Sequence, residues 1–331
     1  MQRDPGATAG GLPEESFAMP QASCELAPPV SGGSAPDTLG KAPPSRRELR
    51  AALAPFAAKS TPIALAWTAL DLVLFAAGLA AIAAPTPVLL KLALAPALAI
   101  VIARLFIIGH DACHQSLTGH RALNRVLGRA VFLPSLTPYS LWEVGHNLAH
   151  HGFSNLRGKD SVWVPFSPEE YARLSPARRL LERLYRGGYG HGLYYLVELW
   201  WKKLYFPSAA QIGAQRPVFV RDGLLVTAFA LLWVGGLATA AQFTGQSALL
   251  LVALGFALPF ALWNALMGFV IYLHHTDPQV AWYDNAEEWA ANQPYLTTTI
   301  HAEVPIIGGW LLHNIMHHPA HHLDMGIPFY R

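Results

Sequence analysis

The sequence predicts an all-α integral membrane protein, with four transmembrane helices in two hairpins and a helical cap on the cytoplasmic side. Two observations predict this class. Of the 331 residues, 53% are hydrophobic and only 13% are charged, against about 25% charged residues in soluble domains. Four long apolar runs divide the chain, and the 15 histidines lie outside them. The net charge of +2, without a basic stripe, argues against nucleic acid as a partner.

The first 44 residues differ in composition from the rest of the chain. They are rich in Pro, Gly, Ala and Ser and show no sustained apolar period, which predicts a disordered tail. No basic segment leads into an apolar one, so the tail does not resemble a signal peptide. Residues 45–331 then form the membrane domain, entered through an interfacial segment around Arg46, Arg47 and Arg50.

The apolar runs cover residues 62–84, 88–108, 224–241 and 248–273. Each approaches or exceeds the roughly 18–20 residues that a helix needs to cross a ~30 Å hydrocarbon core. Short uncharged connections predict that consecutive runs pair as hairpins. The fourth run is longer than the core requires, so its end should leave the bilayer and carry His274 and His275.

Two polar side chains interrupt the first two runs. Asp71 is expected at a contact between helices, because a carboxylate facing lipid is costly. Lys91 stands one turn into the second run and is expected to extend its ammonium toward the membrane interface.

The basic residues predict the orientation of the four spans. Thirteen of the 23 Lys and Arg residues lie within 110–216, and six more precede the first run. Because short cytoplasmic segments are enriched in basic residues, both termini and this central segment are expected in the cytoplasm. All the histidines then lie on the cytoplasmic side.

Most histidines fall into three short boxes, which hold His110, His114, His146, His150, His151, His318, His321 and His322. Residues four apart share one face of a helix, so His110 and His114 can serve one ion, and His146 and His150 likewise. His151 is rotated by ~100° from His150 and can serve a second ion. Eight imidazoles are too many for one metal and suit two.

The residue types narrow the choice of metal without deciding it. Imidazole suits iron, zinc, copper and nickel, and Cys113 should face away from the side of the helix that carries His110 and His114. Iron is the member of this group best suited to O₂ chemistry. Carboxylates near the boxes could accept the second N–H of a ligating imidazole, and the candidates are Asp111, Glu143, Asp160, Asp277 and Asp324.

The remaining histidines give weaker signals. His120 and His191 stand alone and are interpreted as surface or interfacial residues. The roles of His301 and His317 stay open at this stage.

The boxes H-x-x-x-H, H-x-x-x-H-H and H-x-x-H-H resemble those of the membrane-bound fatty-acid desaturase superfamily, over roughly residues 60–330. Segment 109–116 resembles the first box of acyl-lipid desaturases, and segment 155–160 resembles the extension of their second box. Segment 275–278 resembles one that follows the fourth span in the Δ12-like branch. The resemblance implies a four-helix anchor under a cytoplasmic cap that holds two irons. It implies the eight box histidines as ligands, together with His275 and, in the H-N-I element, His313. His317 departs from the family pattern.

The resemblance also implies O₂-dependent desaturation of a fatty acyl chain that is linked to a lipid, to CoA or to a carrier protein. The chain would lie in an apolar tunnel lined in part by residues such as Trp142, Trp163 and Trp282. A separate electron donor of the ferredoxin or cytochrome type is expected, because two cysteines cannot hold a Cys₄ cluster.

Several basic residues could dock an acidic donor or anionic headgroups, or could act only as topology determinants; they are Arg178, Arg179, Arg183, Arg186, Lys202 and Lys203.

Two other functions remain open. A hydroxylase or ketolase of an alkane, carotenoid or lipid could use the same scaffold. A metal transporter should place its ligands near the middle of the bilayer, where this sequence has no histidine.

Overall fold

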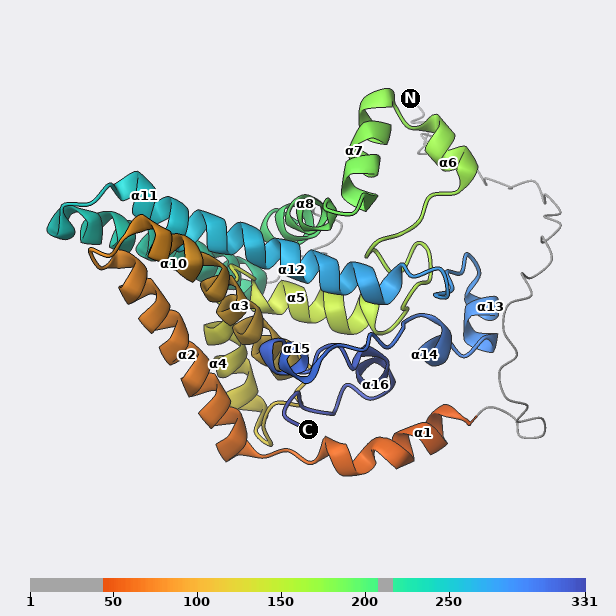
Figure 1. The fold of residues 1–331 in the computed structure, drawn as a ribbon. Helices are drawn as coiled ribbons and strands as arrows, with labels where there is room; N and C mark the ends of the chain where they lie inside the picture. Colours follow the sequence, from red (N-terminus) through yellow and green to blue (C-terminus); the bar gives the residue numbers. More distant parts are fainter. Residues whose placement is uncertain (1–43, 208–216) are drawn as a thin grey trace, which may run out of the picture. The chain divides into compact units, whose positions relative to one another are not determined.

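The computed structural model describes residues 44–207 and 217–331, and the described part is mostly helical and contains no strand (Figure 1). Two isolated β-bridges, Leu156 with Tyr283 and Arg157 with Asp160, are its only extended pairings. The disordered tail predicted for 1–44 falls outside the described residues except for Pro44. The prediction of an all-α protein is confirmed for the described part.

Four helices are long and apolar enough to cross a membrane, as the sequence predicts. They are α2 (Thr61–Ala83), α3 (Val88–Cys113), α10 (Pro217–Thr244) and a continuous run from Ala248 to His275. The last run consists of α11 (Ala248–Val252), a π-helical turn (Ala253–Ala257) and α12 (Leu258–His275). Helix α2 packs on α3, and α10 packs on α11.

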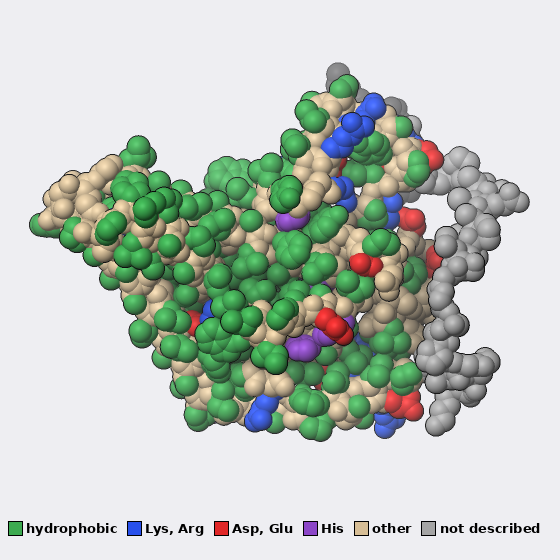
Figure 2. Space-filling view, in the orientation of Figure 1, with side chains coloured by type: hydrophobic (Ala, Val, Ile, Leu, Met, Phe, Trp, Pro, Cys, Tyr) green, Lys and Arg blue, Asp and Glu red, His purple; other side chains and the backbone are tan. Residues whose placement is uncertain are grey.

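The surface over these helices is mainly hydrophobic (Figure 2). Large apolar side chains project from it, among them Leu89, Leu232 and Leu249. A surface of this kind is costly in water and suits lipid. The four helices and this surface together identify a membrane protein.

Three helices extend beyond the predicted apolar runs. Helix α3 continues to Cys113, so the first histidine box begins on the helix, and α12 ends at His275 as expected. Helix α10 begins at Pro217, well before the predicted start at 224. The prediction began too late because the charged residues Arg221 and Asp222 lower the hydropathy of the first two turns. Asp222 is buried and satisfied there, since it accepts hydrogen bonds from Arg129 Nε at 2.8 Å and from the Ser140 N–H at 2.9 Å.

The polar residues of α2 and α3 are buried within the protein. Asp71 Oδ1 accepts a hydrogen bond from Arg104 Nε at 2.9 Å, which confirms the predicted contact between helices. Lys91 is 1% exposed, and its ammonium donates to the carbonyls of Ile82 and Ala84, beside the turn that joins α2 to α3. The end of α2 leaves these carbonyls without helical partners, so they can accept from the lysine.

Shorter helices gather around the ends of α3 and α12 (Figure 1). Between the second and third long helices lie α4 (Arg121–Phe132), α5 (Tyr139–Val144), α6 (Pro168–Arg173), α7 (Pro176–Arg186) and α8 (His191–Tyr194). π-Helical segments follow α5 (Gly145–His150) and α8 (Tyr195–Tyr205). The remaining helices are α1 (Arg46–Leu53), α13 (Ala286–Ala291), α14 (Pro294–Thr297), α15 (Ile306–Leu311) and α16 (His318–Leu323).

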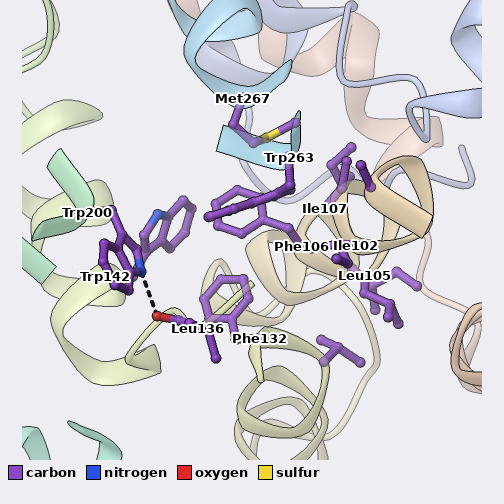
Figure 3. Packing of buried hydrophobic residues seen from close by; sticks show 14 of the residues in the cluster. Ile102, Leu105, Phe106, Ile107, Phe132, Leu136, Trp142, Trp200, Trp263 and Met267 are labelled. Carbon is purple, nitrogen blue, oxygen red and sulfur yellow. Dashed lines mark hydrogen bonds between the residues drawn. The ribbon is translucent and has the colours of Figure 1, made fainter. Parts of the chain in front are cut away.

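An aromatic core joins α3, α4, α5 and α12 directly beside the histidines (Figure 3). The Phe106 ring lies 5.0 Å from that of Phe132, 5.4 Å from that of Trp142 and 5.6 Å from that of Trp263. Gly109 permits this approach, because a Cβ at that position would lie 2.3 Å from the Phe132 ring. The core therefore fixes the last turn of α3, from which His110 projects.

Candidate metal centre

Nine histidines converge in two groups, and all nine are among the ten predicted ligands. The first group consists of His110, His114, His146, His151 and His321. The second consists of His150, His275, His318 and His322. Within each group the potential ligand atoms lie within 4.8 Å of one another. The second and third boxes each contribute to both groups, so a box does not correspond to one ion.

The second box is divided between the groups by a local change in helix type. Helix α5 passes at Gly145 into a π-helical turn, and the N–H of His151 donates to the carbonyl of His146 at 2.9 Å. Hydrogen bonds between residues five apart widen the turn, so residues five apart share a face. The prediction that His146 and His150 serve one ion is not supported: His146 lies with His151, and His150 points into the second group.

The ring nitrogens face one another at short distances. His151 Nε2 lies 3.0 Å from Nε2 of both His146 and His321. His318 Nε2 lies 2.9 Å from Nε2 of His275 and 3.1 Å from Nε2 of His322. Two nitrogens that each lie about 2.1 Å from one ion, at right angles, are about 3.0 Å apart. The spacing within each group therefore fits imidazoles that share a cation.

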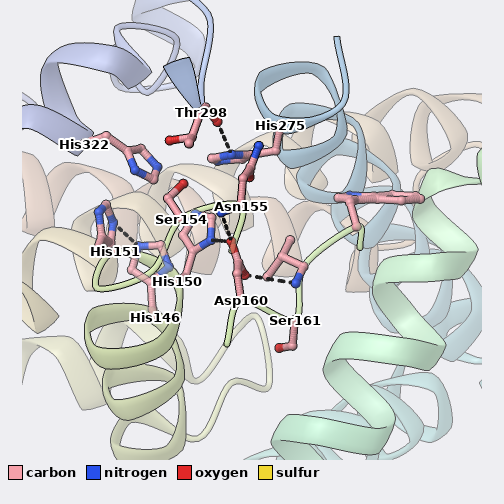
Figure 4. A network of polar contacts seen from close by, with 12 residues as sticks. His146, His150, His151, Ser154, Asn155, Asp160, Ser161, His275, Thr298 and His322 are labelled. Carbon is pink, nitrogen blue, oxygen red and sulfur yellow. Dashed lines mark hydrogen bonds and ion pairs between the residues drawn. The ribbon is translucent and has the colours of Figure 1, made fainter. Parts of the chain in front are cut away.

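Hydrogen bonds to the other ring nitrogen orient three of these imidazoles. His110 Nδ1 lies 3.0 Å from Asp111 Oδ1, and His150 Nδ1 lies 3.0 Å from Asp160 Oδ2. His275 Nδ1 lies 3.1 Å from the carbonyl oxygen of Thr298, as Figure 4 shows. An N–H donated from Nδ1 leaves the lone pair on Nε2 for a metal.

Asp160 is itself held in place from several sides. Its carboxylate accepts hydrogen bonds from the N–H groups of Asn155 at 3.0 Å and Val162 at 3.1 Å, besides its contact with His150. Burial works to raise the pKa of Asp160, but attraction to His150 and these hydrogen bonds outweigh it and lower the pKa. Asp160 is therefore ionised at neutral pH and a strong acceptor for His150.

The other three candidate carboxylates have different partners in the described residues. Glu143 contacts the Tyr139 hydroxyl at 3.4 Å. Asp277 accepts from the N–H of Gln279 at 2.9 Å, and Asp324 lies 3.5 Å from Arg50. Of the five predicted carboxylates, Asp111 and Asp160 are thus the two that orient a histidine.

Burial keeps the imidazoles neutral. It lowers the pKa values of six histidines well below the usual range, and neighbouring imidazoles lower them further; the six are His114, His146, His151, His318, His321 and His322. A neutral imidazole is the form that binds a metal. Several buried ring nitrogens have no hydrogen-bond partner, including His110 Nε2 and both nitrogens of His114. Such atoms are costly to bury, and a cation would satisfy them.

The structure leaves His313 outside both groups. Its Nε2 lies 2.6 Å from Asp71 Oδ2, and Asp71 also binds Arg104. The Arg104 guanidinium donates in turn to the carbonyl of Trp310 at 2.7 Å. The sequence prediction omitted Arg104, although a charged residue inside the apolar run 88–108 could have indicated a buried ion pair.

Five other histidines also lie outside the groups. His274 is buried, and its ring nitrogens lie 2.7 Å from the carbonyl oxygen of Val270 and 3.4 Å from that of Met316. His301 and His317 are exposed, and their rings stack 5.2 Å apart. His120 is exposed as predicted, and His191 is partly buried beside Tyr272.

A cavity of about 340 Å³ opens against the histidines. Its apolar wall includes Phe106, Leu141, Trp142, Met267 and Val270, and five of the nine grouped histidines also line it: His110, His146, His150, His275 and His318. Ligand pockets usually measure about 300–1,000 Å³. The cavity therefore brings an apolar ligand into contact with both groups.

Of the three tryptophans predicted to line a tunnel, Trp142 lines this cavity and stacks on His146 at 4.0 Å. Trp163 instead stacks on Tyr194 at 3.7 Å. Trp282 donates from Nε1 to the carbonyl of His275 at 3.2 Å. The latter two have structural contacts and are absent from the cavity wall.

Four apolar helices, two groups of converging imidazoles and an adjoining apolar cavity define a histidine-rich membrane protein suited to holding two metals beside an apolar ligand. Comparison with known protein families identifies the family to which this membrane protein belongs. The model of the fatty acid desaturase family matches residues 87–331, and the chain belongs to this family.

Relatives within the family agree with the predicted Δ12-like branch. The chain is 30% identical over 232 residues to an sn-1 oleoyl-lipid 12-desaturase of Picosynechococcus, a match that covers 68% of this chain and 62% of the relative. It is 29% identical over 225 residues to a chloroplastic omega-6 fatty acid desaturase of Arabidopsis thaliana, covering 68% and 48%. It is 27% identical over 235 residues to an sn-1 acyl-lipid omega-3 desaturase (ferredoxin) of Nostoc, covering 68% and 60%. The match thus spans about half to three fifths of these relatives.

Proposed function

We propose that the chain desaturates a fatty acyl chain, with O₂, at two iron ions held by the two histidine groups. The observation that carries the proposal is the cavity, because its wall contains imidazoles of both groups. An acyl chain in the cavity would contact His146 of the first group and His150 of the second. The relatives named as desaturases of oleoyl and other acyl lipids support the reaction type.

The proposed ligands are the nine grouped histidines. Iron bound there supplies the oxidising power that hydrogen removal from an unactivated methylene requires. The protein's own part is to bind and orient the substrate and to exclude water. Phe106, Met267 and Val270 give the cavity an apolar wall, and each buried methylene contributes about 0.8 kcal/mol to binding. Asp111 and Asp160 hold His110 and His150 in position.

The proposal includes two membrane hairpins, α2 with α3 and α10 with the run from α11 to α12, with the termini and the histidines on the cytoplasmic side. The distribution of Lys and Arg supports this orientation. Electrons would come from a separate donor of the ferredoxin or cytochrome type. A relative whose name includes ferredoxin supports the first of these.

Three of the six basic residues considered for docking the donor are paired with carboxylates. Arg178 pairs with Glu182 at 2.6 Å and with Glu198 at 2.9 Å. Arg186 pairs with Glu182 at 3.1 Å, and Lys202 pairs with Glu198 at 2.9 Å. These contacts favour a structural role over donor docking for these three residues.

The function is tested by expressing the protein, with a donor system, in a host that lacks desaturation. Mass spectrometry of total lipids should show acyl chains lighter by two hydrogens, and fragmentation should locate the new double bond. His146→Ala and His150→Ala variants should abolish the product. Acyl chains heavier by one oxygen, or an altered carotenoid or alkane pool with unchanged acyl chains, would instead identify the hydroxylase or ketolase.

A further inference from the structure

We propose that Lys203 forms a binding site for an anionic group of the acyl substrate, a phosphate or a carboxylate. The inference rests on the proposed function, because it names the chemical class of substrate that the cavity takes. The sequence presents Lys203 as one of six basic residues in this region, and the structure distinguishes it from the other five.

Among the residues that the structure describes, Lys203 is the only lysine or arginine in the cavity wall. It projects from the π-helical segment after α8, and its Nζ donates to the carbonyl of Ser161 at 2.6 Å. An ammonium has three N–H donors, so this bond leaves two for a ligand. The cavity thus carries the Lys203 ammonium on a wall that is otherwise mainly apolar side chains and imidazoles, with Ser161 and Tyr195 as further polar residues.

Lys203 also differs from its neighbour in having no ionic partner. Lys202 Nζ pairs with Glu198 at 2.9 Å. Over residues 44–207 and 217–331, the structure records no ion pair for Lys203, whose recorded partner is the Ser161 carbonyl. The residue is half-buried and its bond to Ser161 is exposed, so an anion in the cavity could reach the ammonium and act as its counter-ion.

The electrostatic setting agrees with this geometry. Burial lowers the pKa of Lys203, and the negative charges of Asp160 and Glu198 offset this only in part. A bound anion would favour the charged lysine.

The position of Lys203 suits the head of a substrate whose chain reaches the histidines. Ser161 follows Asp160, and Figure 4 shows Ser161 on the far side of Asp160 from His275. The same cavity contacts Lys203 and the imidazoles of both groups. One ligand can therefore place its anion at Lys203 and its methylenes beside His146 and His150.

A lysine ammonium is a compact point charge that recognises anionic oxygen without requiring a planar partner. Three acyl compounds offer such oxygen: a phospholipid, an acyl-CoA and a free fatty acid. An acyl ester without charge, such as diacylglycerol, does not. The site therefore predicts that anionic acyl compounds bind more tightly than neutral ones.

The test measures equilibrium binding to the purified full chain in neutral detergent, so that no turnover is needed. The probes are dioleoylphosphatidylglycerol, oleoyl-CoA, oleate and uncharged dioleoylglycerol. Lys203→Met should raise the Kd of at least one anionic probe by about tenfold, the effect of losing one charge-assisted hydrogen bond. Lys203→Arg should retain most of the affinity. The anionic probe that responds identifies the source of the anion.

Lys202→Met is the matched control, because its ammonium is already paired with Glu198. It should leave every Kd unchanged, and dioleoylglycerol should bind equally to all variants. Equal affinity of wild type and Lys203→Met for all anionic probes would overturn the site, as would an equal loss in Lys202→Met. Desaturation with unaltered binding in Lys203→Met would refute the site alone. Lysine-dependent binding without any desaturation would refute the proposed function alone.

Discussion

His146 Nε2 and His151 Nε2 lie 3.0 Å apart, although the residues are separated by five positions. The π-helical turn that joins them also turns His150 toward the second group. The two groups consequently adjoin: the His151 ring lies 4.3 Å from that of His322, which belongs to the second group. One turn of backbone thus supplies imidazoles to both histidine groups.

This division predicts metal stoichiometry. Replacing both His146 and His151 with Ala should remove ligands from one ion and leave about one iron per chain. Replacing His146 and His150 should weaken both ions and leave less than one. Iron analysis of the purified variants measures the difference. Equal iron content in the two double variants would contradict the division of the second box.

Asp160→Asn should weaken iron binding, because His150 would lose its anionic acceptor while the side chain kept its size. Loss of such a partner typically costs 10–100-fold in metal affinity, and we expect about that range here. Competition with a chelator measures the affinity. Asp277→Asn is the control, since Asp277 contacts a backbone N–H and not an imidazole; an equal effect there would exclude the specific role of Asp160.

The metal-free protein should lose stability as the pH falls below about 6.5, the usual pKa of histidine. Six grouped histidines have pKa values lowered by burial. In this range the unfolded chain binds protons that the folded chain does not, so each histidine costs up to about 1.4 kcal/mol per pH unit. Thermal unfolding at several pH values should show a steep decline. A His120→Ala variant should show the same slope, because His120 is exposed; a flat profile for the wild type would contradict the prediction.

Breaking the buried contact between Asp71 and Arg104 should destabilise the protein strongly. Arg104→Met leaves the Asp71 carboxylate buried beside His313 without its cation, and loss of one partner of a buried pair typically costs about 3–5 kcal/mol. Unfolding in detergent measures the loss. Arg50→Ala is the control, because Arg50 is exposed and lies 3.5 Å from Asp324; it should cost less than about 1 kcal/mol. Similar losses in both variants would refute a special role for the buried contact.

Gly109→Ala should displace the first box, since the added Cβ would lie 2.3 Å from the Phe132 ring. We expect lower iron content and a loss of about 1–3 kcal/mol of stability, as for other overpacked cores. Phe132→Leu in the same chain should restore part of both. Gly235→Ala in α10 should be harmless, because nothing lies within 4 Å of its Cβ position. If Phe132→Leu restored neither iron content nor stability, the clash with the Phe132 ring would not be the cause of the loss.

Apolar length and the boxes were sufficient to predict the four membrane helices and eight of the nine grouped histidines, and the family resemblance added the ninth, His275. Helical spacing paired His110 with His114, and the structure places both in the first group, since α-helical backbone joins them. Helical spacing also paired His146 with His150, which the structure does not support, because no local sequence pattern predicts the π-helical turn between them. The spacing also could not place His313, whose partner Asp71 is 242 positions away in the sequence. Contacts of that range depend on tertiary packing rather than on local pattern.

The histidine groups have a consequence for the biogenesis of the protein. Each group takes at least one imidazole from residues 318–322, so neither metal position is complete until the ribosome has delivered the third box. The bond from Asp71 to His313 also links the earliest membrane helix to the segment just before that box. A chain that stalls before residue 318 would therefore carry the earlier histidines of both groups without their C-terminal partners.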